Sequence, residues 1–263
     1  MEANRALWNE WALIHDRSKF YDVEGFKRGG IRLKDFEVRE VGAVRGKDLL
    51  HLQCHFGIDT LSWARLGANV TGVDFSDRSI DLARSLAEEI GVEARFVLAN
   101  VYQVPAVIDE DFDVVYASRG VLGWLPDLPR WADVVARSLR PGGFLYMHEI
   151  HPFLYVFDDS RGATERRVKF PYWVQSAPLE FAVKGSYADP DAHVNTRVSY
   201  DWPHGMDEIV TSLIDAGLRI DFLHEWPFLD WQLPFLEKRG EVWVYPSPGE
   251  LPLSFSLKAS KPG

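Results

Sequence analysis

The sequence predicts an α/β protein with a Rossmann-like, doubly wound sheet of seven strands, an N-terminal helical cover and an inserted cap region. Two observations predict this fold. From residue 48 to about 150, short apolar runs alternate with amphipathic helical segments, as in a parallel sheet with crossover helices. Within that part, DLLHLQCHFGIDTLSWARLGANVTGVD, from Asp48 to Asp74, reads as strand, turn, helix and strand.

The composition fits one globular domain. The chain has 263 residues, of which 46% are hydrophobic, so it can bury a sizeable core. Its net charge of −10 argues against nucleic acid or an anionic membrane surface as the main partner, because phosphate groups attract clustered Lys and Arg. An acidic surface also serves solubility alone. Nothing in the composition indicates an oligomeric state.

The compartment follows from cysteine usage and the N-terminus. Cys54 is the only cysteine, which excludes an intramolecular disulfide and a Cys-based zinc cluster. The first twenty residues mix charged and apolar residues and lack the core of a signal peptide. No run approaches the roughly 20 apolar residues of a membrane span. We therefore expect a cytoplasmic protein.

The elements of the first half follow in order. Strands are expected at 48–52, 69–74, 94–101, 112–118 and 144–150. Ser76 can cap a helix that ends at Gly91, and a second helix near 127–139 stops at a Pro-Gly-Gly turn.

The second half begins with a break in this rhythm. Residues 152–200 are rich in Pro, aromatic and charged residues, with strand-like pieces RRVKFPYWV and HVNTRVSYDW. MDEIVTSLIDAGL is then an amphipathic helix, and GLRIDFLHEW and LPLSFSLKAS are two strands. We expect a single domain, 1–263, made of an N-terminal cover (1–47), a cofactor-binding core (48–150), an insertion or substrate cap (152–200) and a C-terminal helix and strands (201–263).

The first turn indicates an adenosine cofactor. Asp74 follows Gly57 by 17 positions, close to the interval that places a carboxylate on the ribose hydroxyls in a strand–helix–strand unit. Only Gly57 of a possible glycine trio is present, so the pattern that cradles a pyrophosphate is missing. S-adenosylmethionine, which has no pyrophosphate, is the leading candidate.

The chain resembles the class I S-adenosylmethionine-dependent methyltransferases, in particular a bacterial branch that acts on small molecules. The resemblance spans most of the chain. It is carried by FYDVEGFKRGG, LLHLQCHFGIDTLSWARLGA, VTGVDFS, FDVVYASRGVLGWLPDL, LRPGGFLYMHEIHP, WPHGMDEIVTSLIDAGL and LPLSFSLKA. The family's acid-x-Gly-x-Gly-x-Gly motif is altered, since His51, Gln53 and His55 occupy the acid and first two Gly positions. The turn is therefore expected either to be shaped differently or to point these side chains away from the cofactor.

The resemblance implies a cofactor site at the carboxyl ends of the strands. Asp74 would bind both ribose hydroxyls, unless it only caps the following helix. Asn100 could accept the adenine amine or satisfy local backbone groups. Arg119 could face a carboxylate of cofactor or substrate, or form a surface salt bridge. The implied cofactor-binding residues are Gln53, Cys54, His55, Gly57, Asp74, Phe75, Asn100, Val101, Ser118 and Arg119.

Candidate catalytic residues follow the fifth strand. Alternation puts Glu149 and His151 on one face and His148 on the other, so the first two can orient the substrate or remove a proton, or else anchor the next loop. His204 could face the pocket or cap a helix. Tyr21, in the N-terminal segment, could bond the substrate or line the site with its ring.

The aromatic residues of the insertion and the spacing of the histidines bear on two further kinds of site, an aromatic cage and a metal site. Tyr155, Phe157, Tyr172 and Trp173 of the insertion could enclose an aromatic or cationic acceptor, or belong to the core. No metal site is expected, because the histidines near the fifth strand lack the spacing of a helical His-x-x-x-His pair.

The sequence thus predicts methyl transfer from S-adenosylmethionine to a small-molecule acceptor that is aromatic or amine-bearing. Two alternatives remain open. One is a nicotinamide-dependent oxidoreductase, against which the missing pyrophosphate glycines weigh. The other is a non-catalytic regulatory protein that binds S-adenosylmethionine.

Overall fold

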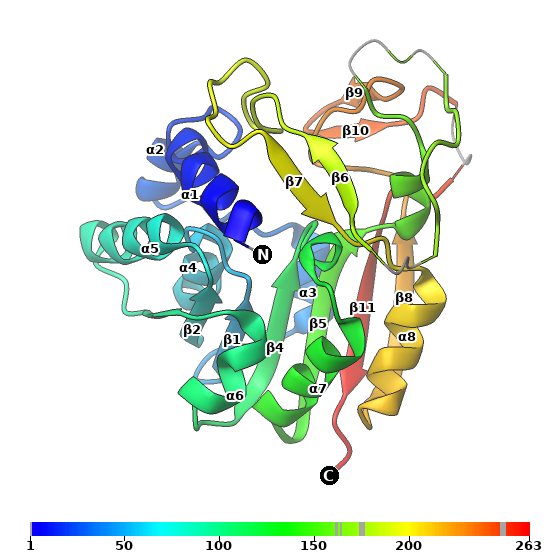
Figure 1. Ribbon diagram of the computed structural model, residues 1–263. Coiled ribbons are helices and arrows are strands. Elements are labelled where there is room, and N and C mark those ends of the chain that lie inside the picture. The colour runs from blue at the N-terminus through cyan, green and yellow to red at the C-terminus, as the bar shows by residue number, and fades with distance from the viewer. Residues whose placement is uncertain (1, 161–162, 164, 174–176, 248–250) are drawn as a thin grey trace.

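The computed structural model describes residues 2–160, 163, 165–173, 177–247 and 251–263. A seven-stranded sheet with the order β3-β2-β1-β4-β5-β11-β8 forms its centre (Figure 1). Strands β1 to β5 pair in parallel, and β11 runs antiparallel to both of its neighbours. The predicted fold class is confirmed. The strands of this sheet are β1 (Asp48–Leu52), β2 (Asn69–Asp74), β3 (Arg95–Leu98), β4 (Phe112–Ser118), β5 (Leu139–Ile150), β8 (Arg219–Trp226) and β11 (Ser254–Ser260).

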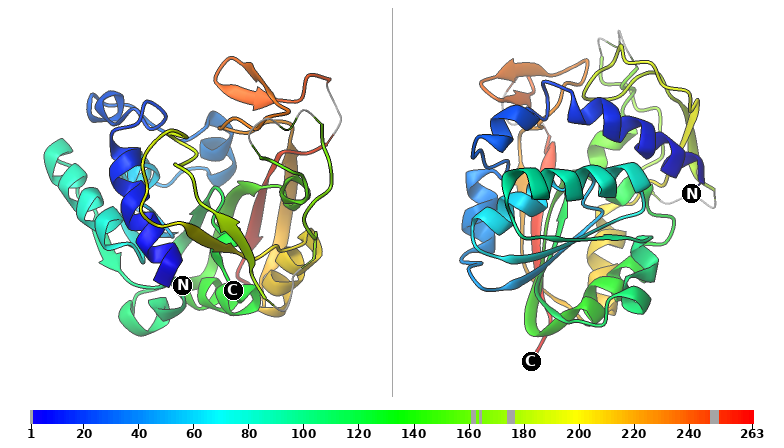
Figure 2. Two further views of the ribbon diagram at one scale, coloured as in Figure 1. Left: turned by 45° about the horizontal axis from the view of Figure 1, so that its top comes forward. Right: turned by 90° about the vertical axis from the view of Figure 1, so that its left-hand side faces the viewer.

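Helices cover both faces of the sheet, because side chains alternate along each strand. Leu50 and Val115 face the cluster under α6, α7 and α8, while their neighbours Leu49 and Val114 face α3 and α4 (Figure 2). Ser76 caps α5 and Gly91 ends it in the left-handed conformation, as predicted. The helices are α1 (Glu2–Asp16), α2 (Val23–Lys27), α3 (Asp35–Val41), α4 (Ile58–Arg65), α5 (Asp77–Ile90), α6 (Val104–Val107), α7 (Leu128–Ser138) and α8 (Met206–Asp215), with 3₁₀ turns η1 (Val101–Gln103), η2 (Leu122–Trp124) and η3 (Pro152–Val156).

The insertion contributes less sheet than its sequence predicts. HVNTRVSYDW supplies β7 (Val198–Asp201), which pairs with β6 (Leu179–Ala182). RRVKFPYWV is not a strand: Val168 makes one isolated bridge to Phe157, and Val174 lies outside the described residues. Pro171 explains this difference, since proline has no N–H to donate to a ladder. A further small ribbon, β9 (Glu237–Arg239) and β10 (Val242–Val244), precedes β11.

The N-terminal helix, the β6–β7 hairpin and the β9–β10 ribbon lie over the edge of the sheet where β1, β4 and β5 end (Figure 1). Three side chains fasten α1 to the insertion. The Asn4 amide exchanges hydrogen bonds with the Tyr200 backbone at 2.7 and 2.9 Å, the Glu10 carboxylate accepts from Thr196 N at 2.9 Å, and Trp11 Nε1 donates to Gly185 O at 2.9 Å. Helix α1 and the insertion therefore form one cover over that edge.

Gly72, in the middle of β2, is a packing constraint. A Cβ at this position would lie 2.8 Å from the Phe96 ring and 2.9 Å from Cys54 Sγ. We expect Gly72→Ala to lower the free energy of unfolding by about 1–3 kcal/mol through overpacking. Urea denaturation measures this change. The cost should shrink in a Phe96→Leu background, and an equal cost in both backgrounds would contradict the steric explanation.

Candidate active site

The candidate site lies at the carboxyl ends of β1 and β4. The chain winds from β1 toward β2 and β3 on one side and resumes with β4 and β5 on the other. Ligands of open α/β sheets bind at such a switch point, where the loops diverge and leave a crevice. The turn after β1, the end of β2 and the loop after β4 meet at this switch point.

The turn after β1 has three residues in the left-handed region of the backbone, and only one of them, Gly57, is a glycine. Gln53, His55 and Gly57 have φ of 57°, 52° and 81°. A non-glycine residue in this left-handed region costs about 1–2 kcal/mol because its Cβ crowds the following carbonyl. A Cβ at Gly57 would in addition lie 2.7 Å from the Phe96 ring. Gln53 and His55 thus adopt a backbone conformation that glycine adopts without strain, and whether their side chains point away from the cofactor stays a prediction.

The side chain of His55 leaves the turn toward α1 and α5. Its Nε2 lies 2.9 Å from Nδ1 of His15, and its Nδ1 lies 3.0 Å from Ser79 Oγ. Gln53 instead contacts the loop after β4, where its Nε2 donates a hydrogen bond to Val121 O at 3.0 Å. Gln53 Oε1 is buried and has no partner in the described part of the chain. This oxygen is therefore an acceptor that has no hydrogen bond in the described part of the chain.

Asp74 ties the end of β2 to the turn. Its Oδ2 accepts from His55 N at 2.9 Å and its Oδ1 accepts from Ser76 N at 2.8 Å. Ser76, not Asp74, caps α5, which removes the alternative role for the acid. Burial raises the pKa of the Asp74 carboxyl to about 6. Half-buried Phe75 follows it on the way to α5.

The other residues predicted to bind the cofactor are mostly buried. Cys54 is a free, buried thiol, and burial raises its pKa well above the ordinary value of a cysteine. Strand β3 ends at Leu98, three residues short of the prediction, so Asn100 follows it and accepts from Tyr102 N at 3.0 Å. The local role weighed for Asn100 is therefore present. Val101 is buried in the main core.

Arg119 lies at the centre of a buried charge cluster. Its guanidinium contacts Glu37 at 2.5 Å and Asp230 at 3.3 Å, and its Nε donates to His148 Nδ1 at 3.1 Å. The salt bridge considered as an alternative for Arg119 is therefore present, but its partners Glu37 and Asp230 are 0% and 13% exposed, so it is not a surface pair. Although burial opposes ionisation, the Arg119 guanidinium holds the pKa of Glu37 well below its usual range.

Ser118 and Asp59 extend this cluster toward the turn. Ser118 Oγ donates to Asp59 Oδ2 at 3.0 Å and lies 3.3 Å from Nε2 of His51. Burial raises the pKa of Asp59, and it lowers the pKa of His51 to about 3. The edge of the sheet therefore carries a neutral histidine beside a cluster of charges.

Glu149 points toward the loop after β4 and holds its backbone. Its carboxylate accepts from the N–H groups of Gly120, of Val121 at 2.8 Å and of Leu122 at 3.1 Å. The alternative weighed for Glu149, that it anchors a loop, describes its contacts in this structure. The loop concerned precedes Glu149 in the chain and is not the one that follows it.

Both ring nitrogens of each candidate histidine, His151 and His204, contact polar groups of the protein. His151 Nδ1 accepts from Phe153 N at 3.2 Å, and its Nε2 lies 3.0 Å from Glu225. His204 Nδ1 lies 2.9 Å from Glu208, and its Nε2 lies 2.8 Å from Leu125 O. His204 therefore joins α8 to the loop after η2. Direct contact of either ring with a substrate stays a prediction.

An aromatic cluster that the sequence did not indicate covers the turn. Trp8, Trp11 and His15 share one face of α1, at i, i+3 and i+7, and pack with Trp124 and Tyr187. Tyr21 adds its ring to this cluster, 5.1 Å from that of His15, and its hydroxyl is hydrogen-bonded to that of Tyr187. The helical spacing of Trp8, Trp11 and His15 could have indicated this shared face from the sequence. Tyr187 lies in a loop, where no periodicity indicates which side chains pack together.

The four insertion aromatics, for which both a cage and core packing were open, differ in burial: Tyr172 packs against the cluster that contains Phe157, Tyr155 is 38% exposed, and a cage stays a prediction. Phe157 is buried in a cluster with Leu229 and Tyr245, and the hydroxyl of Tyr172 accepts from Met206 N at 3.0 Å. Trp173 is 66% exposed. The insertion reaches the turn through Tyr187 instead.

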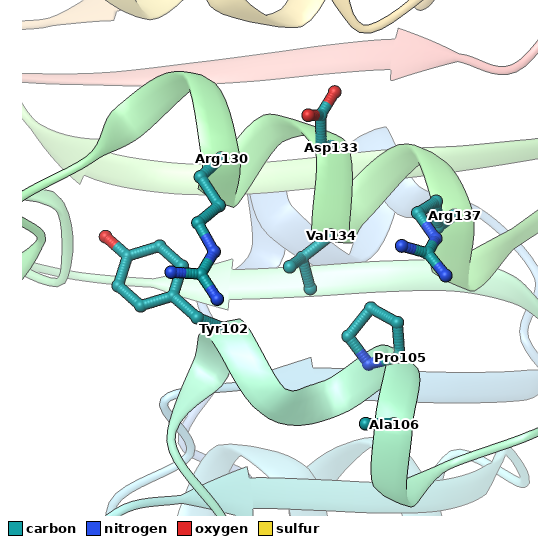
Figure 3. Close-up of a pocket in the computed structure, with 7 residues that line it drawn as sticks. All are labelled: Tyr102, Pro105, Ala106, Arg130, Asp133, Val134 and Arg137. Atoms are coloured by element: carbon teal, nitrogen blue, oxygen red, sulfur yellow. The ribbon is translucent and has the colours of Figure 1, made fainter.

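A cavity of about 340 Å³ lies away from the predicted site, between α6 and α7. Figure 3 shows Arg130 and Arg137 of α7 facing Pro105 and Ala106 of α6, with the Arg130 guanidinium over the Tyr102 ring. Its lining includes none of the residues predicted to bind cofactor or substrate. A second cavity of about 10 Å³, the size of one water, borders Arg119 and Glu149.

Two further properties concern the described residues only. They contain no group of three or more His, Cys, Asp or Glu side chains arranged to hold a metal ion. None of their helices combines the length and the apolar character needed to cross a membrane.

Known proteins share both the sequence and the fold of this region. Residues 50–147 match the family described as methyltransferase domain. The ubiquinone biosynthesis O-methyltransferase from Shewanella pealeana is 33% identical over 44% of this chain and 49% of its own length. The one from Aeromonas salmonicida is 32% identical over 51% of this chain and 58% of its own length. The chain thus spans about half the length of the curated relatives it matches.

Solved structures of S-adenosylmethionine-dependent methyltransferases have the same fold. The one from Clostridium acetobutylicum aligns over 98% of this chain and 100% of its own, with a TM-score of 0.59 and 13% identity. The one from Methanosarcina mazei aligns over 88% of this chain and 98% of its own, with a TM-score of 0.58 and 20% identity. At these identities the likeness concerns the fold.

His51 gives a testable pH dependence. The unfolded chain binds a proton near pH 6.5, whereas the folded state keeps His51 neutral down to about pH 3. Its contribution to stability is therefore full above pH 6.5 and falls as the pH drops toward 3. We expect His51→Asn to remove about 1.4 kcal/mol per pH unit from the pH dependence of the unfolding free energy between pH 6 and 4.

Urea denaturation at several pH values measures this slope. Thr60→Val is the matched control, because Thr60 Oγ1 is the partner of His51 Nδ1 at 2.8 Å and carries no titratable group. It should lower stability equally at each pH. Identical pH slopes in wild type and His51→Asn would contradict the assignment of a neutral His51.

Proposed function

We propose that this chain, whose residues 50–147 match the methyltransferase-domain family, is a class I S-adenosylmethionine-dependent methyltransferase that transfers a methyl group to a small molecule. The observation that carries the proposal is the turn after β1. It keeps three left-handed residues and is hydrogen-bonded to the acid that ends β2, at the switch point of the sheet.

The residues at the switch point suit an adenosine cofactor. Asp74 offers carboxylate oxygens to the two ribose hydroxyls, and Gln53 Oε1 is a buried acceptor without a partner. Half-buried Phe75 offers apolar surface to the adenine ring beside β2. Asn100 offers an amide, and Val101, whose side chain is buried in the core, contributes its backbone. When bound, the sulfonium of S-adenosylmethionine supplies an electrophilic methyl group for an in-line displacement.

The protein's part in the reaction is to hold an acceptor in line with the methyl group and to exclude water. We assign Tyr21 to the wall of the acceptor site, through its ring and its hydroxyl pair with Tyr187. Glu149 shapes the loop after β4, and His204 fixes the end of that loop to α8. His151 positions the start of the insertion through η3.

The acceptor is proposed to be a small aromatic or amine-bearing molecule. The aromatic rings of α1 and Tyr187 over the turn favour a planar or cationic group. The relatives named above methylate oxygen in ubiquinone biosynthesis, which agrees with a small aromatic acceptor. The net charge of −10 disfavours nucleic acid.

Calorimetric titration tests the cofactor. We expect S-adenosylhomocysteine and S-adenosylmethionine to bind with micromolar Kd, and NADH not to bind. Asp74→Ala should weaken S-adenosylhomocysteine by about 100-fold, since hydrogen bonds to a charged group contribute about 1.5–3 kcal/mol each. Asp81→Ala, an exposed acid on α5, is the matched control. Failure of the wild type to bind either S-adenosyl ligand would reduce the assignment to a likeness of fold.

The pH dependence of this affinity gives a second test. Because the pKa of Asp74 is raised to about 6, its carboxyl is protonated below that pH and accepts hydrogen bonds poorly. We expect S-adenosylhomocysteine to bind about tenfold more weakly at pH 5 than at pH 7. Asp74→Asn should bind weakly with little change between these values. A wild-type Kd that does not vary with pH would exclude Asp74 as the contact.

A further inference from the structure

The cavity between α6 and α7 is large enough for a small organic molecule. Its volume is about 340 Å³, and ligand pockets in proteins have volumes from about 300 Å³ upward. The cavity that borders Arg119 and His148 has a volume of only about 10 Å³, which is room for one water. Of these two cavities, the one between α6 and α7 can therefore admit a ligand without movement of the protein.

Two arginines of α7 line this cavity. Arg130 and Arg137 are seven residues apart, so they lie on the same face of the helix, about 10.5 Å apart along its axis. Figure 3 shows both side chains pointing toward α6, with Val134 between them. Two guanidinium groups therefore flank a common space.

Neither guanidinium group has a carboxylate partner among the described residues. The Arg130 guanidinium lies over the Tyr102 ring, 4.9 Å from its centroid, and neither Arg130 nor Arg137 forms an ion pair with a described residue. Asp133 also lines the cavity, but Figure 3 shows its carboxylate pointing away from α6. Asp127 accepts from the backbone N–H of Arg130 at 3.0 Å. Both arginines are thus available to an anionic ligand, although the chain as a whole has a net charge of −10.

The surface between the two arginines is apolar. Pro105 and Ala106 of α6 lie across the cavity from Val134 of α7 (Figure 3). A compact anion such as phosphate would leave this surface in contact with water, whereas methylene groups would cover it. A linear molecule with an anionic group at each end and an apolar middle matches both the charges and the apolar surface.

We propose that the cavity between α6 and α7 binds a linear organic dianion, a dicarboxylic acid with an apolar chain. One carboxylate pairs with Arg130 and the other with Arg137, each by the forked N–H···O geometry that guanidinium groups favour. The chain of the ligand lies over Pro105, Ala106 and Val134. This inference is independent of the proposed function, because none of these five residues is assigned to the cofactor or the acceptor.

The small number of lining residues favours a small molecule over an acidic segment of another protein. Seven residues line the cavity, whereas a stable protein partner buries roughly 20–30 residues on each side. The charges at the two ends would attract either kind of ligand, so the experiment includes both.

Ligand-observed NMR at low ionic strength measures the binding of suberate, a linear dicarboxylate, to the full chain. Octanoate, which has one carboxylate on a chain of similar length, and succinate, which has two carboxylates on a short chain, are the comparison ligands. We expect suberate to bind with a Kd of about 1 mM or lower. Each comparison ligand should bind at least about fivefold more weakly, because octanoate loses one ion pair and succinate loses the apolar contact.

Four variants locate the site. Arg130→Gln and Arg137→Gln should each weaken suberate binding about fivefold or more, because each removes one charged partner. Ala106→Glu places a carboxylate opposite the arginines and should abolish binding. Arg39→Gln, which removes an exposed arginine in the last turn of α3, is the matched control and should leave the Kd unchanged. Thermal unfolding should show that all four variants fold.

The proposal is overturned if suberate binds no more tightly than octanoate or succinate, because the site then does not engage two anionic groups. An unchanged Kd in both folded arginine variants places the ligand elsewhere. Inorganic phosphate that binds as tightly as suberate leaves only a general attraction of anions to the arginines. Absence of suberate binding rejects the dianion, and binding of a glutamate-rich peptide in its place assigns the cavity to an acidic protein segment.

Discussion

The hydrogen bonds between the Asp74 carboxylate and the backbone around it are the constraint on which the rest of the site depends. Asp74 accepts from His55 N and from Ser76 N, so one buried acid fixes the turn after β1 and the start of α5 together. The turn needs this support, because Gln53 and His55 each hold a left-handed backbone at about 1–2 kcal/mol. The side chains of these two residues make further contacts. Gln53 donates a hydrogen bond to Val121 O in the loop after β4, and His55 contacts His15 of α1.

Burial acts on the ionisable groups of the site in opposite directions according to their charge. It raises the pKa of Asp74 and Asp59 and lowers that of His15 and His51, since each group is driven toward its neutral form. Glu37 and Asp230 are exceptions, because the Arg119 guanidinium stabilises their charges and lowers the pKa of both carboxyls. The histidines are thus hydrogen-bonding groups that remain uncharged at physiological pH. The charged cluster includes Glu37 of α3, and its Asp59 and Arg119 are near enough to act electrostatically on Tyr21 and Tyr187 of the aromatic cluster.

The sequence predicted what depends on local periodicity and missed what depends on contacts distant in the chain. Alternating and helical patterns placed the seven strands, and Ser76 and Gly91 marked the limits of α5. Alternation also placed Glu149 near the carboxyl edge, but its partners are backbone N–H groups 27 and 28 positions earlier, which no side-chain pattern reveals. RRVKFPYWV alternates as a strand does, yet Pro171 lacks the N–H that pairing requires. Tyr187 lies in a loop, where periodicity carries no information.

The link from the turn to the insertion has a consequence for binding. His55 joins the turn to His15, and Asn4, Glu10 and Trp11 join α1 to the insertion. The proposed cofactor side and the proposed acceptor side therefore share one chain of contacts. A ligand that shifts α1 must change the contacts of His55, and a ligand that alters the turn must change the position of α1. Any such coupling is reciprocal, because the free energy by which one ligand changes the affinity of the other is the same in both directions. The strained His55 is therefore better explained as the junction of the two sides than as a degenerate glycine position, because glycine would relieve the backbone and remove the contact.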